Sequence, residues 1–230
     1  MYSKIIYQIT HLNSNRQINL KNNKERDRVY NKFSEEQKSM FKSIQKYIFT
    51  FCEATSGSGK TLVSVSSMLD LLANEKINSI VYIQKPSRRS LSQGYLPGSL
   101  EEKSNILWEP FYEAMTNLGY QPEAVDVMSN NGLINLSTDC ALRGINFEKI
   151  GVIIDEAENM DVETLKLIFT RCHDSSHIVL IGDRKQKDNP GQKGDDFVRY
   201  GDYLANKSFG NKCYLTKNYR GKFSQAAEDF

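Results

Sequence analysis

The chain has 230 residues, with 30 lysines and arginines against 28 aspartates and glutamates and a formal net charge of +2. Hydrophobic residues make up 39% and charged residues 25%, which is the composition of a globular protein and argues against a disordered chain. A charge of +2 is too small to imply nucleic-acid binding by itself, and no apolar run approaches the roughly 18 residues of a membrane span, so we expect a cytoplasmic protein without a membrane partner.

The cysteines and histidines do not form a metal-binding or disulfide pattern. The 4 cysteines contain no Cys-x-x-Cys pair, and the three histidines lack metal-ligand spacing with neighbouring carboxylates. We therefore expect buried thiols, and we expect any metal ion to arrive with a nucleotide. The cysteines are Cys52, Cys140, Cys172 and Cys213.

The first 33 residues are predicted to form a polar N-terminal arm, and residues 34–230 a single domain. Residues 16–32 are rich in Asn and basic side chains and have few apolar anchors, which indicates a surface arm or loose lead-in. A helix is expected to follow, because Met40 and Ile44 recur at helical spacing.

Apolar runs alternate with helical patterns along the rest of the chain. This alternation is typical of an α/β fold with a mostly parallel sheet and helices on both faces. The predicted strands are residues 47–52, 80–83, 150–154 and 178–181. The predicted helices are residues 61–73, 100–118, 162–171 and 195–205.

A phosphate-binding loop follows the first predicted strand. Residues 54–61 read ATSGSGKT, which fits the phosphate-loop pattern with Ala in place of the first Gly. Glycines let the backbone N–H groups face the phosphates, the lysine supplies a positive charge, and the threonine hydroxyl can bind Mg²⁺. A chance Gly/Ser-rich turn is disfavoured by the flanking strand and helix. The predicted ATP-contacting residues are Ser56, Gly57, Ser58, Gly59, Lys60, Thr61 and Leu62.

Two carboxylates end the strand predicted at residues 150–154. The segment GVIIDEAEN leads from that strand into Asp155 and Glu156. Asp155 would hold Mg²⁺ together with Thr61, and Glu156 could polarise the attacking water. A surface acidic cluster is the alternative, which a preceding phosphate loop makes less favoured. The pattern therefore predicts Mg²⁺-dependent ATP hydrolysis.

A third strand end carries an amide. The segment HIVLIGDRKQ ends in Gly182, Asp183 and Gln186. Gln186 could reach the γ-phosphate or the attacking water, as amides do in other phosphoryl-transfer enzymes. Considered alone, this segment is a polar turn.

Together these motifs resemble those of the PhoH-like ATPases, whose cores are similar to the first domain of superfamily-one helicases. Besides the phosphate loop, the resemblance includes YLPGSLEEK at residues 95–103, DEAEN at residues 155–159 and GDRKQ at residues 182–186. It implies a RecA-like P-loop NTPase fold with ATP and Mg²⁺ as its ligands.

The resemblance also implies roles for residues outside these motifs. Gln37 corresponds to glutamines that contact adenine, although an ordinary helix-surface glutamine is an equally good interpretation. YLTKNYRG at residues 214–221 looks like a strand-end arginine motif of the helicase relatives, which makes Arg220 a γ-phosphate partner. Two residues depart from the family pattern: Lys85 stands in place of an arginine, and Glu158 in place of a glutamine that links nucleotide state to other sites.

We expect an ATPase that remodels or moves along RNA or single-stranded DNA in a helicase-like way. A loop with Lys85, Arg88, Arg89 and Tyr95 could hold a phosphate backbone and stack a base, although solvated surface charge also explains it. The alternative function is an ATP-dependent switch or assembly factor that binds a protein partner. A small-molecule kinase is disfavoured, because Glu156 and Gln186 favour water as the acceptor.

Only one RecA-like core fits this length, so a second wall for the ATP site must come from elsewhere. We expect a homo-oligomer, with a hexameric ring as one form, in which an arginine of one subunit completes the site of its neighbour. The candidates are Arg171, at the end of a predicted helix, and Arg220, followed by Arg143. Ordinary surface charge is the alternative interpretation for Arg171.

Overall fold

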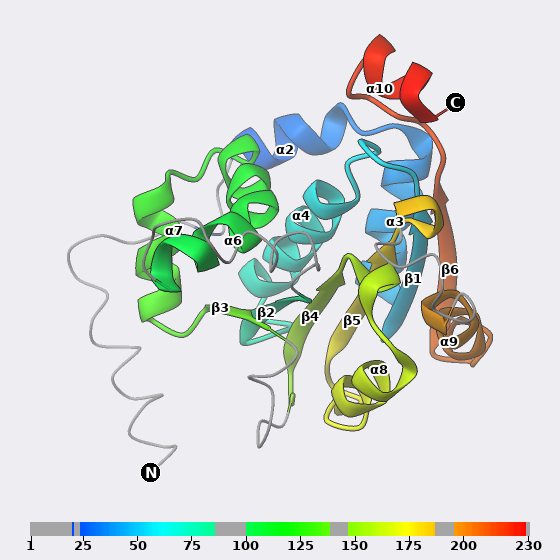
Figure 1. Ribbon diagram of the computed structural model, residues 1–230. Helices are drawn as coiled ribbons and strands as arrows, with labels where there is room; N and C mark the ends of the chain where they lie inside the picture. The colour runs from blue at the N-terminus through cyan, green and yellow to red at the C-terminus, as the bar shows by residue number, and fades with distance from the viewer. Residues whose placement is uncertain (1–19, 21–23, 86–99, 139–146, 187–195, 229–230) are drawn as a thin grey trace.

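The computed structural model describes residues 20, 24–85, 100–138, 147–186 and 196–228 of the protein (Figure 1). Within these ranges, no helix is long and apolar enough to cross a membrane. The YLPGSLEEK motif, apart from its last residues, and the predicted basic loop at Arg88, Arg89 and Tyr95 lie outside the described residues, as does Arg143.

Six described strands form one parallel sheet in the order β3-β2-β4-β5-β1-β6. The predicted α/β fold is therefore confirmed, and the four predicted strands are the central ones. The two edge strands, β3 and β6, were not predicted from apolar runs, because each mixes polar residues into its pattern. The strands are β1 (Phe49–Ala54), β2 (Ser79–Gln84), β3 (Ile134–Ser137), β4 (Ile150–Asp155), β5 (His177–Gly182) and β6 (Gly210–Leu215).

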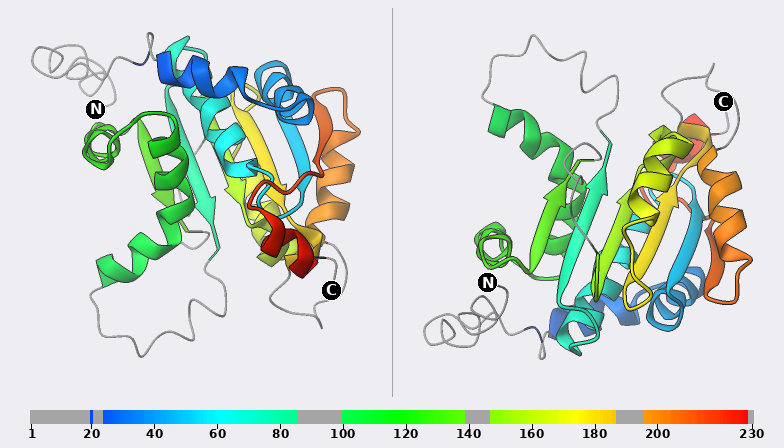
Figure 2. Two further views of the ribbon diagram at one scale, coloured as in Figure 1. Left: turned by 90° about the horizontal axis from the view of Figure 1, so that it is seen from above. Right: turned by 90° about the horizontal axis from the view of Figure 1, so that it is seen from below.

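Helices cover both faces of the sheet (Figures 1 and 2). One face packs against α3, α4, α6 and α7, and the other against α8 and α9. Successive strand residues alternate between the two cores, as Tyr82 and Ile83 do, which is why the central strands are apolar throughout. The helices are α2 (Lys24–Asn31), α3 (Glu35–Lys46), α4 (Lys60–Ala73), α6 (Leu100–Asn117), α7 (Pro122–Asn130), α8 (Val162–Phe169), α9 (Asp196–Ala205) and α10 (Lys222–Glu228).

Part of the predicted N-terminal arm is folded onto the domain. Helix α2 lies within residues 16–32, and the guanidinium of its buried Arg26 donates a hydrogen bond to the Leu69 carbonyl at 3.1 Å. Tyr30 packs its ring against Phe41. The expectation of a loose lead-in is therefore wrong for α2, because a long basic side chain can reach a buried acceptor while its stem packs against apolar groups. The domain boundary at residue 33 stays a prediction.

The parallel sheet brings the sequence motifs together at the carboxyl ends of its strands. The carboxyl ends of β1, β4, β5 and β6 lie next to one another, because these strands are neighbours in one direction. In α/β sheets this is the end at which ligands bind. The phosphate loop, the DEAEN segment, the GDRKQ turn and the NYRG segment each follow one of these strand ends.

Candidate active site

The two glycines of the phosphate loop are required both by conformation and by space. Gly57 has φ +66° and Gly59 has φ +81°, in the left-handed region that favours glycine. A Cβ on Gly57 would lie 2.6 Å from Asn218 Oδ1, and one on Gly59 would lie 2.8 Å from Gln37 Nε2. Gly59 caps α4 without a side-chain hydrogen bond, so the helix N-terminus is open to an anion.

The predicted metal ligands are in direct contact. Thr61 Oγ1 donates a hydrogen bond to Asp155 Oδ2 at 2.7 Å, although 94 residues separate them in sequence. Asp155 is 1% exposed, and its Oδ1 accepts the backbone N–H of Glu156 at 2.8 Å. A hydroxyl and a carboxylate at this distance form the donor set that could hold Mg²⁺.

Lys60 forms an ion pair with Glu156 beside this contact. The Lys60 Nζ lies 3.4 Å from Glu156 Oε1. Burial by itself would lower the pKa of Lys60, but the neighbouring carboxylates, Asp155 and then Glu156 foremost, outweigh it and raise that pKa above its ordinary value. Lys60 is therefore a permanent cation. Glu156 has φ +53°, a strained conformation for a residue with a side chain, and such strain is common in active sites.

Gln37 contacts the phosphate loop. Its Nε2 donates to the Ser58 carbonyl at 2.9 Å, while its Oε1 accepts the Ser34 N–H in the capping box of α3. At 8% exposure it is not the ordinary surface glutamine that was the alternative. A contact with adenine stays a prediction, and the amide already helps to hold the loop in shape.

The segment after β6 folds over the same loop. The Tyr219 N–H donates to the Gly57 carbonyl at 2.9 Å, and the Arg220 guanidinium donates to Ser56 Oγ at 3.2 Å. Asn218, which the sequence interpretation missed, accepts the Arg220 N–H on its side-chain oxygen at 2.8 Å. The sequence feature that could have indicated Asn218 is its place in NYRG, two residues before the predicted phosphate partner Arg220. Arg220 thus lies at the phosphate loop of its own chain.

Comparison with known proteins agrees with the motifs. The family described as PhoH-like protein matches residues 30–223. This chain belongs to the PhoH-like family. A PhoH-like protein of Synechocystis sp. is 29% identical over 154 residues, which is 67% of this chain and 47% of that protein. Protein PhoH of Escherichia coli K12 is 26% identical over 158 residues, 68% of this chain and 45% of the relative. The chain spans about half the length of the curated relatives it matches.

The remaining predicted site residues of this PhoH-like chain lie further from the loop. Gln186 is exposed in a short 3₁₀ turn, η3 (Arg184–Gln186), at the carboxyl end of β5 and hence at the correct edge of the sheet. Arg171 lies beyond α8, and its carbonyl accepts the Phe147 N–H at 2.8 Å, just before β4 begins. Arg171 therefore lies near the amino ends of the strands, opposite the candidate site, and does not reach the site of its own chain. Leu62 packs partly against the hydrophobic core.

Lys85, one of the departures from the PhoH-like pattern, is engaged within the chain. Its Nζ lies 3.2 Å from Asp161 Oδ2, and Asp161 caps α8 through the Thr164 N–H. Its charge is thus partly used to hold the start of α8. This makes Lys85 a weaker candidate for a phosphate backbone than an unengaged surface lysine would be.

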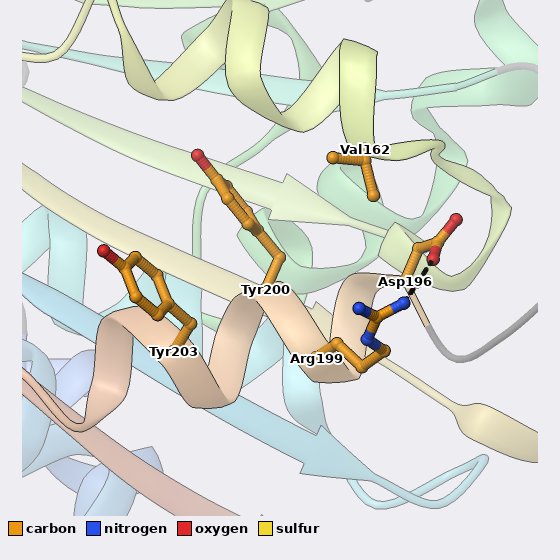
Figure 3. A pocket seen from close by; sticks show the side chains of 5 residues that line it. All are labelled: Val162, Asp196, Arg199, Tyr200 and Tyr203. Carbon is orange, nitrogen blue, oxygen red and sulfur yellow. Dashed lines mark ion pairs between the residues drawn. The ribbon is translucent and has the colours of Figure 1, made fainter.

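A separate pocket lies between α8 and α9 (Figure 3). It has a volume of about 350 Å³, and Tyr200 and Tyr203 of α9 stack side by side at its wall. Arg199, which also lines the pocket, is ion-paired with Asp196 at 3.9 Å. None of its five lining residues is a predicted site residue, so the pocket is distinct from the phosphate loop. They are Val162, Asp196, Arg199, Tyr200 and Tyr203.

Glu158, the other departure from the PhoH-like pattern, connects two strand ends. It is 2% exposed, and its Oε2 accepts the Asp183 N–H at 3.0 Å, which joins the end of β4 to the end of β5. Burial, followed by repulsion from Glu156, raises the pKa of Glu158 to about 9. Burial and the neighbouring carboxylate thus favour the uncharged form of Glu158, which resembles the uncharged glutamine of the family more closely than its sequence suggests.

We expect Glu158→Gln to flatten the pH dependence of the free energy of unfolding. Between the ordinary glutamate pKa of 4.5 and about 9, folded Glu158 keeps a proton that the unfolded chain releases, so wild-type stability falls as pH rises. The slope is at most about 1.4 kcal/mol per pH unit. Glutamine has no proton to lose and no such slope.

Urea unfolding at several pH values across this window measures the effect. Glu163→Gln, which changes an exposed carboxylate on α8, is the matched control and should keep the wild-type slope. Parallel stability curves for wild type and Glu158→Gln would contradict the assignment of a neutral Glu158.

Proposed function

We propose that this chain binds ATP with Mg²⁺ and hydrolyses it. The observation that carries this proposal is the direct contact of Thr61 with Asp155 at 2.7 Å, beside the Lys60–Glu156 ion pair at 3.4 Å. Each predicted chemical role thus has a side chain within one small region. The glycine conformations and the open N-terminus of α4 fit a polyphosphate.

The division of labour among these residues follows from their surroundings. Lys60 is held as a cation and neutralises phosphate charge, while Asp155 and Thr61 supply oxygen ligands for Mg²⁺. When bound, Mg²⁺ lowers the negative charge of the phosphates, which favours nucleophilic attack. Glu156 retains 28% side-chain exposure, so its carboxylate can orient a water molecule and accept its proton.

The positions of Arg220 and Gln186 suit a phosphate-sensing role. Arg220 is fixed at Ser56 of the loop, so its guanidinium is available to the terminal phosphate of a bound nucleotide. Gln186 follows β5, at the same edge of the sheet. Both residues belong to the proposed catalytic group, and Gln37, which contacts the loop at the Ser58 carbonyl, is the proposed adenine contact.

The proposal extends to RNA or single-stranded DNA as the substrate that hydrolysis remodels, in the cytoplasm. It rests on the resemblance to helicase cores and on the basic sequence at Arg88 and Arg89. The alternative is a slow ATP-dependent switch that binds a protein partner. Both share the nucleotide site, so the response to nucleic acid separates them.

ATP turnover should be measured alone and with RNA, single-stranded DNA and duplex DNA. We expect turnover that rises with a single strand and is absent in Lys60→Ala, which controls for contaminating ATPases. Turnover that no nucleic acid changes would leave the switch as the better function. Absence of Mg²⁺-dependent ATP binding would contradict the whole proposal.

We expect Arg88→Ala combined with Arg89→Ala to weaken binding to single strands and to flatten its dependence on salt. Because the variant makes fewer phosphate contacts, its binding releases fewer counterions, and the slope of log K against log salt falls by about 1 to 2 in magnitude. Arg199→Ala combined with Lys207→Ala removes two exposed charges, one on α9 and one just beyond it, and serves as the control. Titrations with equal slopes for the Arg88 and Arg89 variant and wild type would refute the basic-loop hypothesis.

A further inference from the structure

A buried tyrosine contacts the proposed metal carboxylate. The hydroxyl of Tyr82, which is 0% exposed, donates a hydrogen bond to Asp155 Oδ2 at 2.9 Å. The same oxygen accepts the Thr61 hydroxyl at 2.7 Å, while Oδ1 accepts the Glu156 N–H. Both carboxylate oxygens of Asp155 are therefore held by donors before any ligand is considered. Two of these donors come from the motifs, and Tyr82 does not.

The sheet and α6 fix the position of the tyrosine ring. Strand β2 pairs with β4 so that Tyr82 lies opposite Ile153, two residues before Asp155. On its other side the ring packs against Trp108 and Phe111 of α6, with ring centroids 6.3 and 5.2 Å away. The ring has little freedom to move, so packing alone sets the position of the hydroxyl.

The hydroxyl is the donor in this contact. A phenol O–H next to a carboxylate oxygen donates to it. A second acceptor, Gln84 Oε1, lies 3.5 Å from the Tyr82 hydroxyl, so the bond to Asp155 at 2.9 Å is the shorter of the two.

We propose that Tyr82 is a positioning residue for Mg²⁺, which holds Asp155 Oδ2 in the orientation that the metal site requires. The inference rests on the proposed function, since it concerns the Mg²⁺ that accompanies ATP. Thr61 is itself a proposed metal ligand, whose hydroxyl can offer a lone pair to Mg²⁺ while it donates its proton to Asp155. Tyr82 is not a ligand, and it can hold the carboxylate with or without the metal. Partners that orient ligands in this way typically contribute about 10–100-fold to metal affinity.

The decisive variant is Tyr82→Phe in the full chain. Phenylalanine keeps the ring packed against Trp108 and Phe111 and removes only the donor to Asp155. ATP binding is measured by calorimetry over a series of Mg²⁺ concentrations and in excess EDTA. Mg²⁺ is expected to increase the affinity for ATP, and we expect Tyr82→Phe to need about 10-fold or more Mg²⁺ than wild type to reach half of that increase. In EDTA the two proteins should bind ATP equally.

Tyr120→Phe is the matched control. Tyr120 is also buried, and its hydroxyl has no hydrogen-bond partner among the described residues. It lies in the turn between α6 and α7, outside the motif segments. This variant removes a buried tyrosine hydroxyl without touching Asp155, so its Mg²⁺ requirement should equal that of wild type.

The outcomes separate this inference from the proposed function. A Tyr82→Phe protein with the wild-type Mg²⁺ requirement, or one that loses ATP binding equally with Mg²⁺ and with EDTA, overturns the positioning role. A wild-type protein that binds no ATP in either condition overturns the proposed function first and the inference with it. If circular dichroism shows that Tyr82→Phe is unfolded, Tyr82→Met, which also fills the space without a donor, is judged by the same criteria.

Discussion

Glu156→Gln is expected to bind MgATP with nearly wild-type affinity and to lose turnover by about 10²–10⁴-fold. An amide keeps the size of the side chain and an oxygen toward Lys60, whose Nζ is 3.4 Å away, but it cannot accept the proton of the attacking water. The variant separates binding from chemistry, because the proposed ligands of phosphate and Mg²⁺ are untouched. Calorimetry measures the binding, and phosphate release measures the turnover.

Two comparison proteins make this result interpretable. Lys60→Ala should weaken MgATP binding, because it removes the cation that would neutralise phosphate charge. Glu163→Gln changes an exposed carboxylate on α8 and should turn over ATP like wild type. Normal turnover by Glu156→Gln would remove Glu156 as the base, whatever Lys60→Ala shows.

The sequence was most informative where chemistry imposes spacing. The loop at residues 54–61 needs its glycines, lysine and threonine in fixed order, and the strand that ends in Asp155 is buried on both faces, so both segments can be recognised locally. The four central strands could be predicted because burial on both faces makes them apolar throughout. Edge strand β6 is polar at Asn211 and Lys212 because only part of it is covered, and its pattern therefore resembles a loop.

The contacts that complete the site were out of reach of such patterns. Tyr82 meets Asp155 across 73 residues, and Arg220 meets Ser56 across 164 residues. In sequence, Tyr82 is one apolar residue of a buried strand, and nothing in its neighbours marks its hydroxyl as bonded. Its partner is set by the register of β2 against β4, which a single sequence does not specify.

Glu158 shows a related limit. Its identity suggests a charge beside the proposed catalytic carboxylates, whereas burial favours its uncharged form, and its Oε2 accepts the Asp183 N–H. The change from the family's glutamine to Glu158 therefore alters the chemistry of this position less than the change of residue type implies. The surroundings of the side chain decide whether the carboxyl group is charged or uncharged, and those surroundings are a property of the fold.

Arg220→Ala is expected to reduce ATP turnover by about 10³–10⁵-fold, equivalent to roughly 4 to 7 kcal/mol of barrier. The guanidinium is held over the phosphate loop by Ser56, and no neutral side chain can replace its charge at a terminal phosphate. Arg220→Lys should recover only a small part of the rate, because a lysine lacks the planar fork of donors. Arg199→Ala, which removes an exposed arginine of α9, is the control.

Mixing variants decides whether Arg220 acts in its own subunit or across an interface. In a shared-site oligomer, Lys60→Ala subunits keep their arginines and Arg220→Ala subunits keep their phosphate loops, so a mixture regains activity only if Arg220 serves a neighbour. Because Arg220 contacts the loop of its own chain at 3.2 Å, we expect no recovery from this pair.

The same mixture with Arg171→Ala tests the remaining arginine. Arg171 lies near the amino ends of the strands, beside Phe147, so any role at an ATP site requires a second subunit. Recovery in the Arg171→Ala mixture, with none for Arg220→Ala, would assign one arginine within the chain and one across the interface. Recovery with Arg220→Ala would mean that its contact with Ser56 is exchanged between subunits. Full, concentration-independent turnover by a protein that sediments as a monomer would exclude the shared site altogether, and it would leave Arg220 to complete the ATP site from within its own chain.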